Sequence, residues 1–136
     1  MKKQNPLNNQ QGFTLVEIIA VLIILGILAA VAVPRYIDLE VSSKKRGLEA
    51  ALAELNGRES LVWAETKISG SGTASGVMLV GDVTDPDNHL YLGADYSWSG
   101  TPNSGSGVLD FKGQTATLSR TAETDTKPGV WTLTHN

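Results

Sequence analysis

The sequence contains no cysteine and only two histidines. Without cysteine the chain can form neither a disulfide nor a thiolate metal site. His89 and His135 lie far apart in the chain, so they do not indicate a metal site either. If the chain carries an exported domain, its core and its backbone hydrogen bonds must hold that domain together without a covalent link.

An excess of charge of either sign is also missing. The chain has 11 basic and 14 acidic residues, a net charge of -3. Nucleic-acid binding needs a concentration of Lys and Arg, so no nucleic-acid partner is expected. No Ser/His/Asp grouping can be placed together, and no glycine-rich phosphate loop follows a strand. We therefore predict that the chain is not an enzyme and needs no cofactor.

Charge is almost absent from residues 13–33, FTLVEIIAVLIILGILAAVAV, in which Glu17 is the single charged residue. A helix rises 1.5 Å per residue, so this segment spans about 30 Å, the thickness of a bilayer's hydrocarbon core. We predict a transmembrane helix at 13–34. The preceding residues 1–12 are polar and carry Lys2 and Lys3, which favours a cytoplasmic location for them.

The helix is expected to continue as an amphipathic segment over residues 35–68. Apolar residues recur there at spacings of three, four and seven, which is typical of a helix covering a sheet. Gly47 and Gly57 each weaken the helix by about 1 kcal/mol relative to Ala, and Asn56-Gly57 could end it early. The apolar stripe consists of Ile37, Val41, Leu48, Leu52, Leu55 and Val62, with Lys45 and Glu59 in its gaps.

The rest of the chain predicts β structure. Residues 69–76, SGSGTASG, are expected to be a flexible connector, and residues 77–136 to form an antiparallel sheet with the helix on one face, an α+β fold. Trp63, Trp98 and Trp131 are expected to pack in the core or between helix and sheet. The expected strands are 77–80, 90–92, 108–111, 115–118 and 130–133, with a hairpin turn at 112–114.

A basic leader ending at Gly12 precedes the apolar segment, the reverse of a secretory signal, in which the apolar part is removed. The junction Gly12-Phe13-Thr14-Leu15-Val16-Glu17 resembles that of the type IV pilin and pseudopilin family. The resemblance implies that a prepilin peptidase cleaves after Gly12 on the cytoplasmic side and that Phe13 is then N-methylated. It further implies a single-pass precursor in the bacterial inner membrane, an assembly platform there, and an extracellular filament of copies or other pilins.

Glu17 is costly in a plain membrane anchor, because a charge at the centre of a bilayer helix costs about 2.5–3.5 kcal/mol. The resemblance gives Glu17 a role: it would neutralise the amino terminus of Phe13 in a neighbouring subunit during assembly. Gly26 and Pro34 also match the family pattern. In filaments of this family the helix between such residues can be unwound, which implies flexibility under tension; Pro34 could equally mark the membrane exit.

Residues 34–40, PRYIDLE, look most like the corresponding segment of mannose-sensitive-haemagglutinin-type pilins. The resemblance thus implies a structural pilus subunit. Two alternatives stay open: a pseudopilin of a type II secretion system, and an accessory minor pilin that binds a ligand for adhesion or DNA uptake.

Two charged clusters remain. Asp82, Asp85, Asp87, Asn88 and Asp95 provide oxygen ligands of the kind calcium prefers. Major pseudopilins of type II secretion, which this chain resembles at its N-terminus, carry a calcium site in their globular domain. The spacing does not match an EF-hand loop, and turn formation around Pro86 is the commoner explanation. Lys44-Lys45-Arg46 are expected to form a solvated helix face or to pair at helical spacing with Asp38, Glu40 and Glu49.

Overall fold

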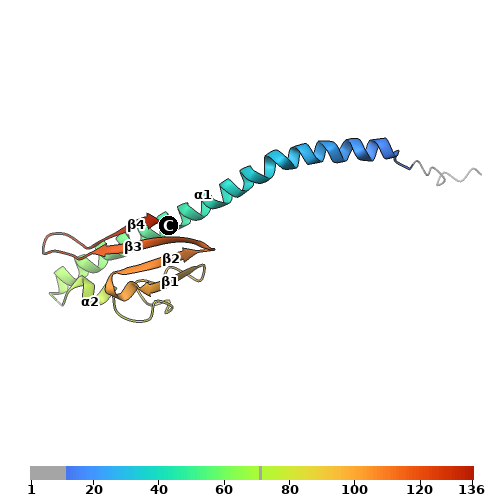
Figure 1. The fold of residues 1–136 in the computed structure, drawn as a ribbon. Helices are drawn as coiled ribbons and strands as arrows, with labels where there is room; N and C mark the ends of the chain where they lie inside the picture. The colour runs from blue at the N-terminus through green and yellow to red at the C-terminus, as the bar shows by residue number, and fades with distance from the viewer. Residues whose placement is uncertain (1–11, 71) are drawn as a thin grey trace, which may run out of the picture. The chain divides into compact units, whose positions relative to one another are not determined.

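A computed structural model describes residues 12–70 and 72–136, so the proposed leader, residues 1–12, lies outside the described part except for Gly12. The predicted α+β fold, a long helix on a small antiparallel sheet, is confirmed (Figure 1). The elements in chain order are α1 (Leu15–Ser69), α2 (Ala74–Met78), β1 (Tyr96–Thr101), a 3-10 turn (Pro102–Ser104), β2 (Ser106–Phe111), β3 (Gln114–Thr121) and β4 (Val130–His135).

The chain divides into two compact units, Met1–Leu39 and Glu40–Asn136. The described part of the first unit is helical from Leu15 on and has no tertiary core. The second unit contains the sheet, α2 and the remainder of α1. The helix passes through Asn56-Gly57, as the apolar stripe predicts.

The sheet is a simple antiparallel meander with strand order β1-β2-β3-β4. β2 and β3 form a tight hairpin in which Phe111 pairs with Gln114. Its two turn residues, Lys112 and Gly113, have φ angles of 52° and 85°. Positive φ at both positions is the geometry of a type I′ turn, whose twist matches that of the strands it joins.

One face of the sheet packs on α1. The alternating inward residues of the strands are buried, and so are three members of the predicted stripe, Leu48, Leu55 and Val62. Fully burying a leucine contributes about 1.5–3 kcal/mol, so this contact accounts for much of the stability of the unit. Trp131 is buried as predicted, whereas Trp63 and Trp98 are only partly buried. The sheet side of the core consists of Leu109, Ala116, Leu118 and Trp131.

The prediction of a strand at 77–80 is wrong. The prediction of a flexible connector at 69–76 is wrong for residues 74–76. Residues 74–78 form the short helix α2. Ala74 and Met78, four residues apart, are both buried in the core. One helical turn places these two side chains on the same side and about 6 Å apart along the axis, whereas a strand would separate them by about 13 Å.

The strand predicted at 90–92 is also wrong, and the strand at 96–101 was missed. Leu90 is buried, but side chains bind the backbone around it: Arg58 Nη1 donates to the carbonyls of His89 and Tyr91 at 3.1 and 2.6 Å. Trp98 Nε1 donates to the Leu90 carbonyl at 2.9 Å. These bonds replace a strand partner. The alternation of Tyr96 and Trp98 with serines was the overlooked signal of β1.

Candidate assembly site in the N-terminal helix

The helix start is built by Thr14 and Glu17. Thr14 donates from its backbone N–H and from its hydroxyl to Glu17 Oε2, both at 2.7 Å. Glu17 N–H donates to Thr14 Oγ1 at 3.3 Å. This reciprocal pair is a capping box, which satisfies N–H groups that a helix start leaves without partners. Sequence reasoning missed the role of Thr14, although Thr-x-x-Glu before an apolar run is the sequence signature of the motif.

The capping box leaves Glu17 with a free acceptor. Only Oε2 is engaged within the described part of the chain, so Oε1 can accept from another group. A carboxylate near a helix start is also favoured by the helix dipole. These two effects lower the cost of holding Glu17 in an apolar surrounding. Gly12 and Phe13, directly before the cap, are exposed in the single chain.

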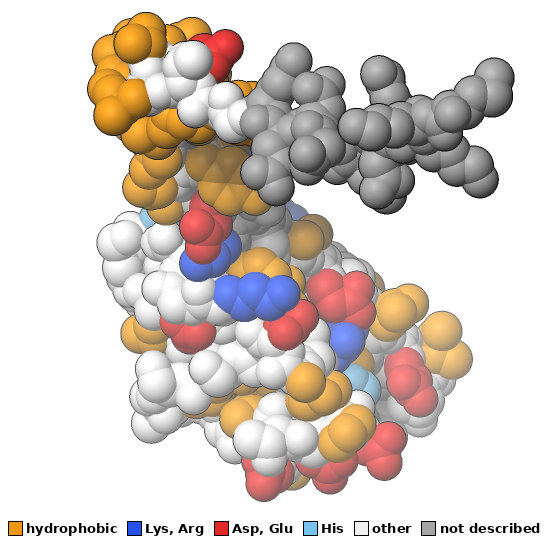
Figure 2. Space-filling view, turned by 90° about the vertical axis from the view of Figure 1, so that its right-hand side faces the viewer, with side chains coloured by type: hydrophobic (Ala, Val, Ile, Leu, Met, Phe, Trp, Pro, Cys, Tyr) orange, Lys and Arg blue, Asp and Glu red, His pale blue; other side chains and the backbone are white. Residues whose placement is uncertain are grey.

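The segment after the cap has an apolar surface on all sides. α1 contains an 18-residue window of mean hydropathy 3.0, none of it buried, so it is long and apolar enough to cross a membrane by length and composition. Figure 2 shows hydrophobic side chains gathered over this segment. Such a surface is stable only against lipid or against other apolar helices.

Gly26 and Pro34 both lie inside the continuous helix α1. A Cβ built on Gly26 meets no atom within 4 Å, so packing within the chain does not require glycine there. Pro34 has no N–H and cannot bond to the carbonyl of Ala30, four residues earlier. Both residues weaken the helix locally, and their role in flexibility stays a prediction.

Three of the four aspartates considered for calcium have carboxylate partners, each a different one. Asp82 Oδ1 accepts from the N–H and the hydroxyl of Thr84, both at 2.8 Å, and these bonds lower the pKa of Asp82. Asp85 Oδ1 accepts from Asp87 N–H at 3.0 Å, and Asp95 pairs with Lys112 at 3.5 Å. Among the described residues no group of three or more His, Asp and Glu could hold a metal ion. The geometry of Asp82 and Asp85 is that of turn formation.

A buried ion cluster that the sequence did not reveal joins α1, α2 and β3. Glu59 on α1 is fully buried and pairs with Arg120 on β3, whose side chain is 3% exposed. Arg120 Nη2 also pairs with Glu123 at 2.7 Å, and Arg120 Nη1 donates to the Ser75 hydroxyl at 2.8 Å. A Cβ on Gly129 would lie 2.5 Å from Glu59 Oε1, so only glycine fits beside the cluster.

The environment of Glu123 favours its charged form. Burial alone would raise its pKa, but hydrogen bonds from the Ser75 hydroxyl and N–H and from Arg120 outweigh this effect and lower the pKa to about 2. The hydrogen bond to Glu59 is the main cause that raises the pKa of Arg120. Arg120 and Glu123 thus keep their charge at neutral pH.

Comparison with known proteins agrees with this architecture. The family described as "Prokaryotic N-terminal methylation motif" matches residues 7–33. The "Type IV narrow pilus major component PilA5" of Thermus thermophilus is 30% identical over 85% of this chain and 92% of its own length. The "Type IV major alpha-pilin" of Moraxella bovis is also 30% identical, over 93% of this chain and 86% of its own length. No solved structure matches significantly.

A third similarity is confined to part of the chain. A "Fimbrial protein" of Pseudomonas aeruginosa is 43% identical over 56 residues, 33% of this chain and 36% of its own length. An N-terminal apolar helix, a four-stranded antiparallel sheet and the methylation motif define a pilin-like subunit. The full-length similarity shows that this chain belongs to the type IV pilins.

Proposed function

We propose that this chain is the structural subunit of a type IV pilus-like filament and polymerises through its N-terminal helix. The observation that carries the proposal is the wholly exposed apolar segment that begins directly after Gly12-Phe13 and holds one charged residue, Glu17. Lipid and a bundle of like helices are both apolar, so the same surface suits a membrane-bound precursor and an assembled filament.

The proposed processing follows from the junction. A prepilin peptidase would remove residues 1–12 on the cytoplasmic side of the inner membrane and leave Phe13 as an N-methylated terminus. The match of the methylation motif to residues 7–33 supports this step. The domain after the helix would lie outside the membrane until assembly carries it into an extracellular filament.

In assembly Glu17 would pair with the Phe13 amine of a neighbouring subunit. Each charge is expensive alone in an apolar surrounding, and pairing offsets much of that cost. The free Oε1 of Glu17 supports the pairing, because the carboxylate can accept from an amine without giving up its bonds to Thr14.

The relatives favour a filament-building subunit without enzymatic activity. The two relatives that align with most of the chain are both named as major pilus components. No comparable observation favours a secretion pseudopilin or an accessory ligand-binding subunit.

The test combines Glu17→Gln with an intact-mass measurement of the mature chain. Gln keeps the capping box but removes the charge, so membrane insertion and cleavage after Gly12 should persist while the yield of sheared filaments falls sharply. Glu65→Gln, at an exposed position on α1, is the matched control and should give normal yield. A wild-type chain that starts at Met1, or normal filament yield from Glu17→Gln, would contradict the proposal.

A further inference from the structure

The turn of α1 at Lys44-Lys45-Arg46 presents positive charge that the subunit does not neutralise. Lys44 Nζ pairs with Glu40 Oε1 at 2.8 Å, the helical pairing that the sequence predicts. Lys45 and Arg46 have no acidic partner within the described residues. We call Lys45 and Arg46 the basic turn. Two adjacent cations without a partner indicate a surface suited to an acidic partner.

The loop between α2 and β1 has the opposite character. Asp82, Asp85 and Asp87 are all exposed, and none of them pairs with a described Lys or Arg. The bonds of Asp82 and Asp85 to neighbouring residues order the loop, whereas the Asp87 carboxylate has no partner among the described residues. We call these three residues the acidic loop. Like charges held this close repel one another unless a cation lies opposite them.

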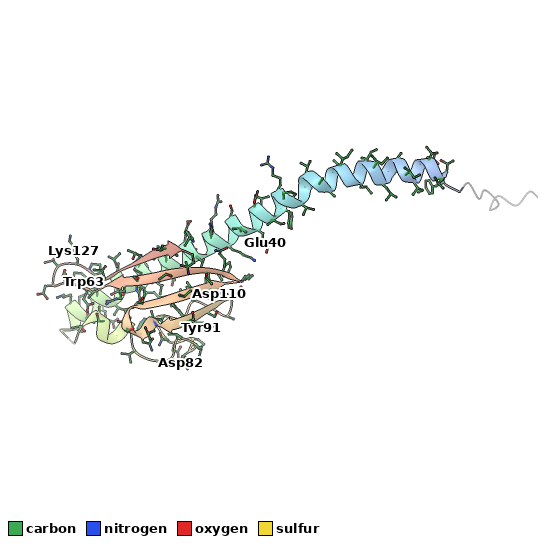
Figure 3. All side chains as sticks on the ribbon, viewed as in Figure 1. Glu40, Trp63, Asp82, Tyr91, Asp110 and Lys127 are labelled. Carbon is green, nitrogen blue, oxygen red and sulfur yellow. The ribbon has the colours of Figure 1, made fainter. Side chains whose placement is uncertain are left out.

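The two surfaces do not meet within one subunit. Arg58 holds the carbonyls of His89 and Tyr91 that follow the acidic loop. Arg58 lies 12 residues beyond Arg46 on α1, which is about 18 Å along the helix axis. In Figure 3 Asp82 lies at the β1 side of the sheet, away from α1. The acidic loop and the basic turn therefore do not form an ion pair with each other within one subunit.

We propose that the acidic loop of one copy of this chain docks on the basic turn of the next copy in the filament. This inference rests on the proposed function. Each copy carries both surfaces, and the surfaces differ, so the contact is heterologous and propagates into an open-ended polymer rather than a closed dimer. Exposed apolar side chains accompany both surfaces: Val80, 63% exposed, precedes the acidic loop, and Val41, 39% exposed, lies one turn before the basic turn.

A second copy fits these surfaces better than a metal ion or a nucleic acid. The acidic loop offers no group of three carboxylates that could hold a metal, within the part of the chain that the structure describes. Two free cations are few for a nucleic acid, whose binding scales with the number of phosphates neutralised. Complementary charges on one chain also fix the orientation in which copies meet.

The test is a charge swap in the full chain, with sheared filament yield as the readout. Asp87→Arg and Arg46→Asp should each lower the yield about tenfold or more, because each places like charges opposite one another. The double variant carrying both changes should restore it. Lys127→Glu, a reversal at an exposed lysine with no side-chain partner among the described residues, should leave the yield unchanged. Membrane-fraction levels of each variant show whether the subunit itself is intact.

The outcomes separate this inference from the proposed function. Normal yield from both single variants, or a double variant as poor as the singles, would overturn the docking while leaving a filament subunit. Loss of wild-type filaments on calcium chelation, without rescue by the swap, would assign the acidic loop to a cation instead. A wild-type chain that forms no filaments would contradict the proposed function.

Discussion

At the scale of single residues, Arg120 has the largest structural role. It lies between Glu59 and Glu123 where little water reaches, so its charge stabilises two carboxylates at once. A buried ion pair adds little net stability over a well-packed apolar pair, but removing one partner leaves a buried charge uncompensated. Replacing one member of the cluster should therefore cost more stability than the intact cluster contributes.

We predict that Arg120→Ala lowers the free energy of unfolding by about 3–5 kcal/mol, because the buried Glu59 side chain loses its partner. Lys67→Ala is the control: its partner Asp125 is fully exposed, and the expected loss is below about 1 kcal/mol. Urea denaturation of a chain beginning at Glu40 measures both. Similar losses for the two variants would show that the cluster is not a special determinant of stability.

The low pKa of Glu123 predicts that the stability of the fold depends on pH. Its folded-state pKa is lowered to about 2 from a usual value of 4.5. Its ionisation thus stabilises the fold fully above the unfolded pKa, and this contribution is lost as the pH falls from about 4.5 towards 2. In Glu123→Gln that contribution is missing at every pH. The stability difference between wild type and variant should be largest near pH 6 and shrink towards pH 2; a constant difference would exclude the charge as its source.

At the scale of elements, two glycines of α1 have different roles. Gly47 lies where the helix approaches β2, and a Cβ there would lie 2.6 Å from the ring of Phe111. That ring stacks on Tyr96 at a centroid distance of 4.6 Å, and the Tyr96 hydroxyl donates to the Gly47 carbonyl at 3.0 Å. Gly57 has no atom within 4 Å of such a Cβ. Of these two glycines, only Gly47 has a packing reason to be glycine.

We predict opposite effects of the same substitution at these positions. Gly57→Ala should stabilise the domain by up to about 1 kcal/mol through helix propensity. Gly47→Ala should destabilise it by about 1–3 kcal/mol, because the Phe111 ring must move out of its packed position. Thermal unfolding of the two variants side by side provides the measurement. Stabilisation by both would mean that the ring shifts without cost.

The long helix and the strands expected at 108–111, 115–118 and 130–133 were predictable from the sequence, whereas the conformation of 77–80 and 90–92 was not. The stripe containing Leu48, Leu55 and Val62 repeats over many turns, so its period identifies a helix. Residues 77–80 and 90–92 are short apolar runs, for which strand and buried helix or loop look alike. Met78 and Leu90 are buried, as their apolar side chains suggest. Their backbone conformation depends on partners far along the chain, such as Arg58 for the 89–91 segment.

Functional and buried polar residues were likewise predictable only where the signal is local in the sequence. Glu17 was recognisable because a charge inside an apolar run is expensive, and Thr14 could have been found from its spacing to Glu17. Glu59 and Arg120 are 61 residues apart in the chain, and their pairing becomes visible only when the sheet is laid on the helix. Asn56-Gly57 could have ended the helix early, but α1 continues through it as expected. The contact of Asn56 was not foreseen: its amide side chain bonds to both backbone groups of Trp131, at 2.7 and 3.0 Å.

At the scale of the whole molecule, the two units have opposite solvent requirements. The Glu40–Asn136 unit buries its core within itself, whereas the segment before it exposes its apolar surface. We predict that a chain beginning at Glu40 is soluble, shows mixed helix and strand in circular dichroism, and melts cooperatively. The full chain should need detergent or lipid. Aggregation or a gradual melt of the shorter chain would indicate that the fold depends on the apolar segment.

The position of β4 as the last strand of the sheet in chain order sets an order for folding during synthesis. Trp131 of β4 fills the core and binds Asn56 on α1. Because chains emerge amino terminus first, α1 exists for most of translation with its apolar stripe incompletely covered. The domain can close only after its final strand has left the ribosome and, in an exported chain, crossed the membrane. A nascent chain lacking its last strand should therefore be open to proteases and chaperones.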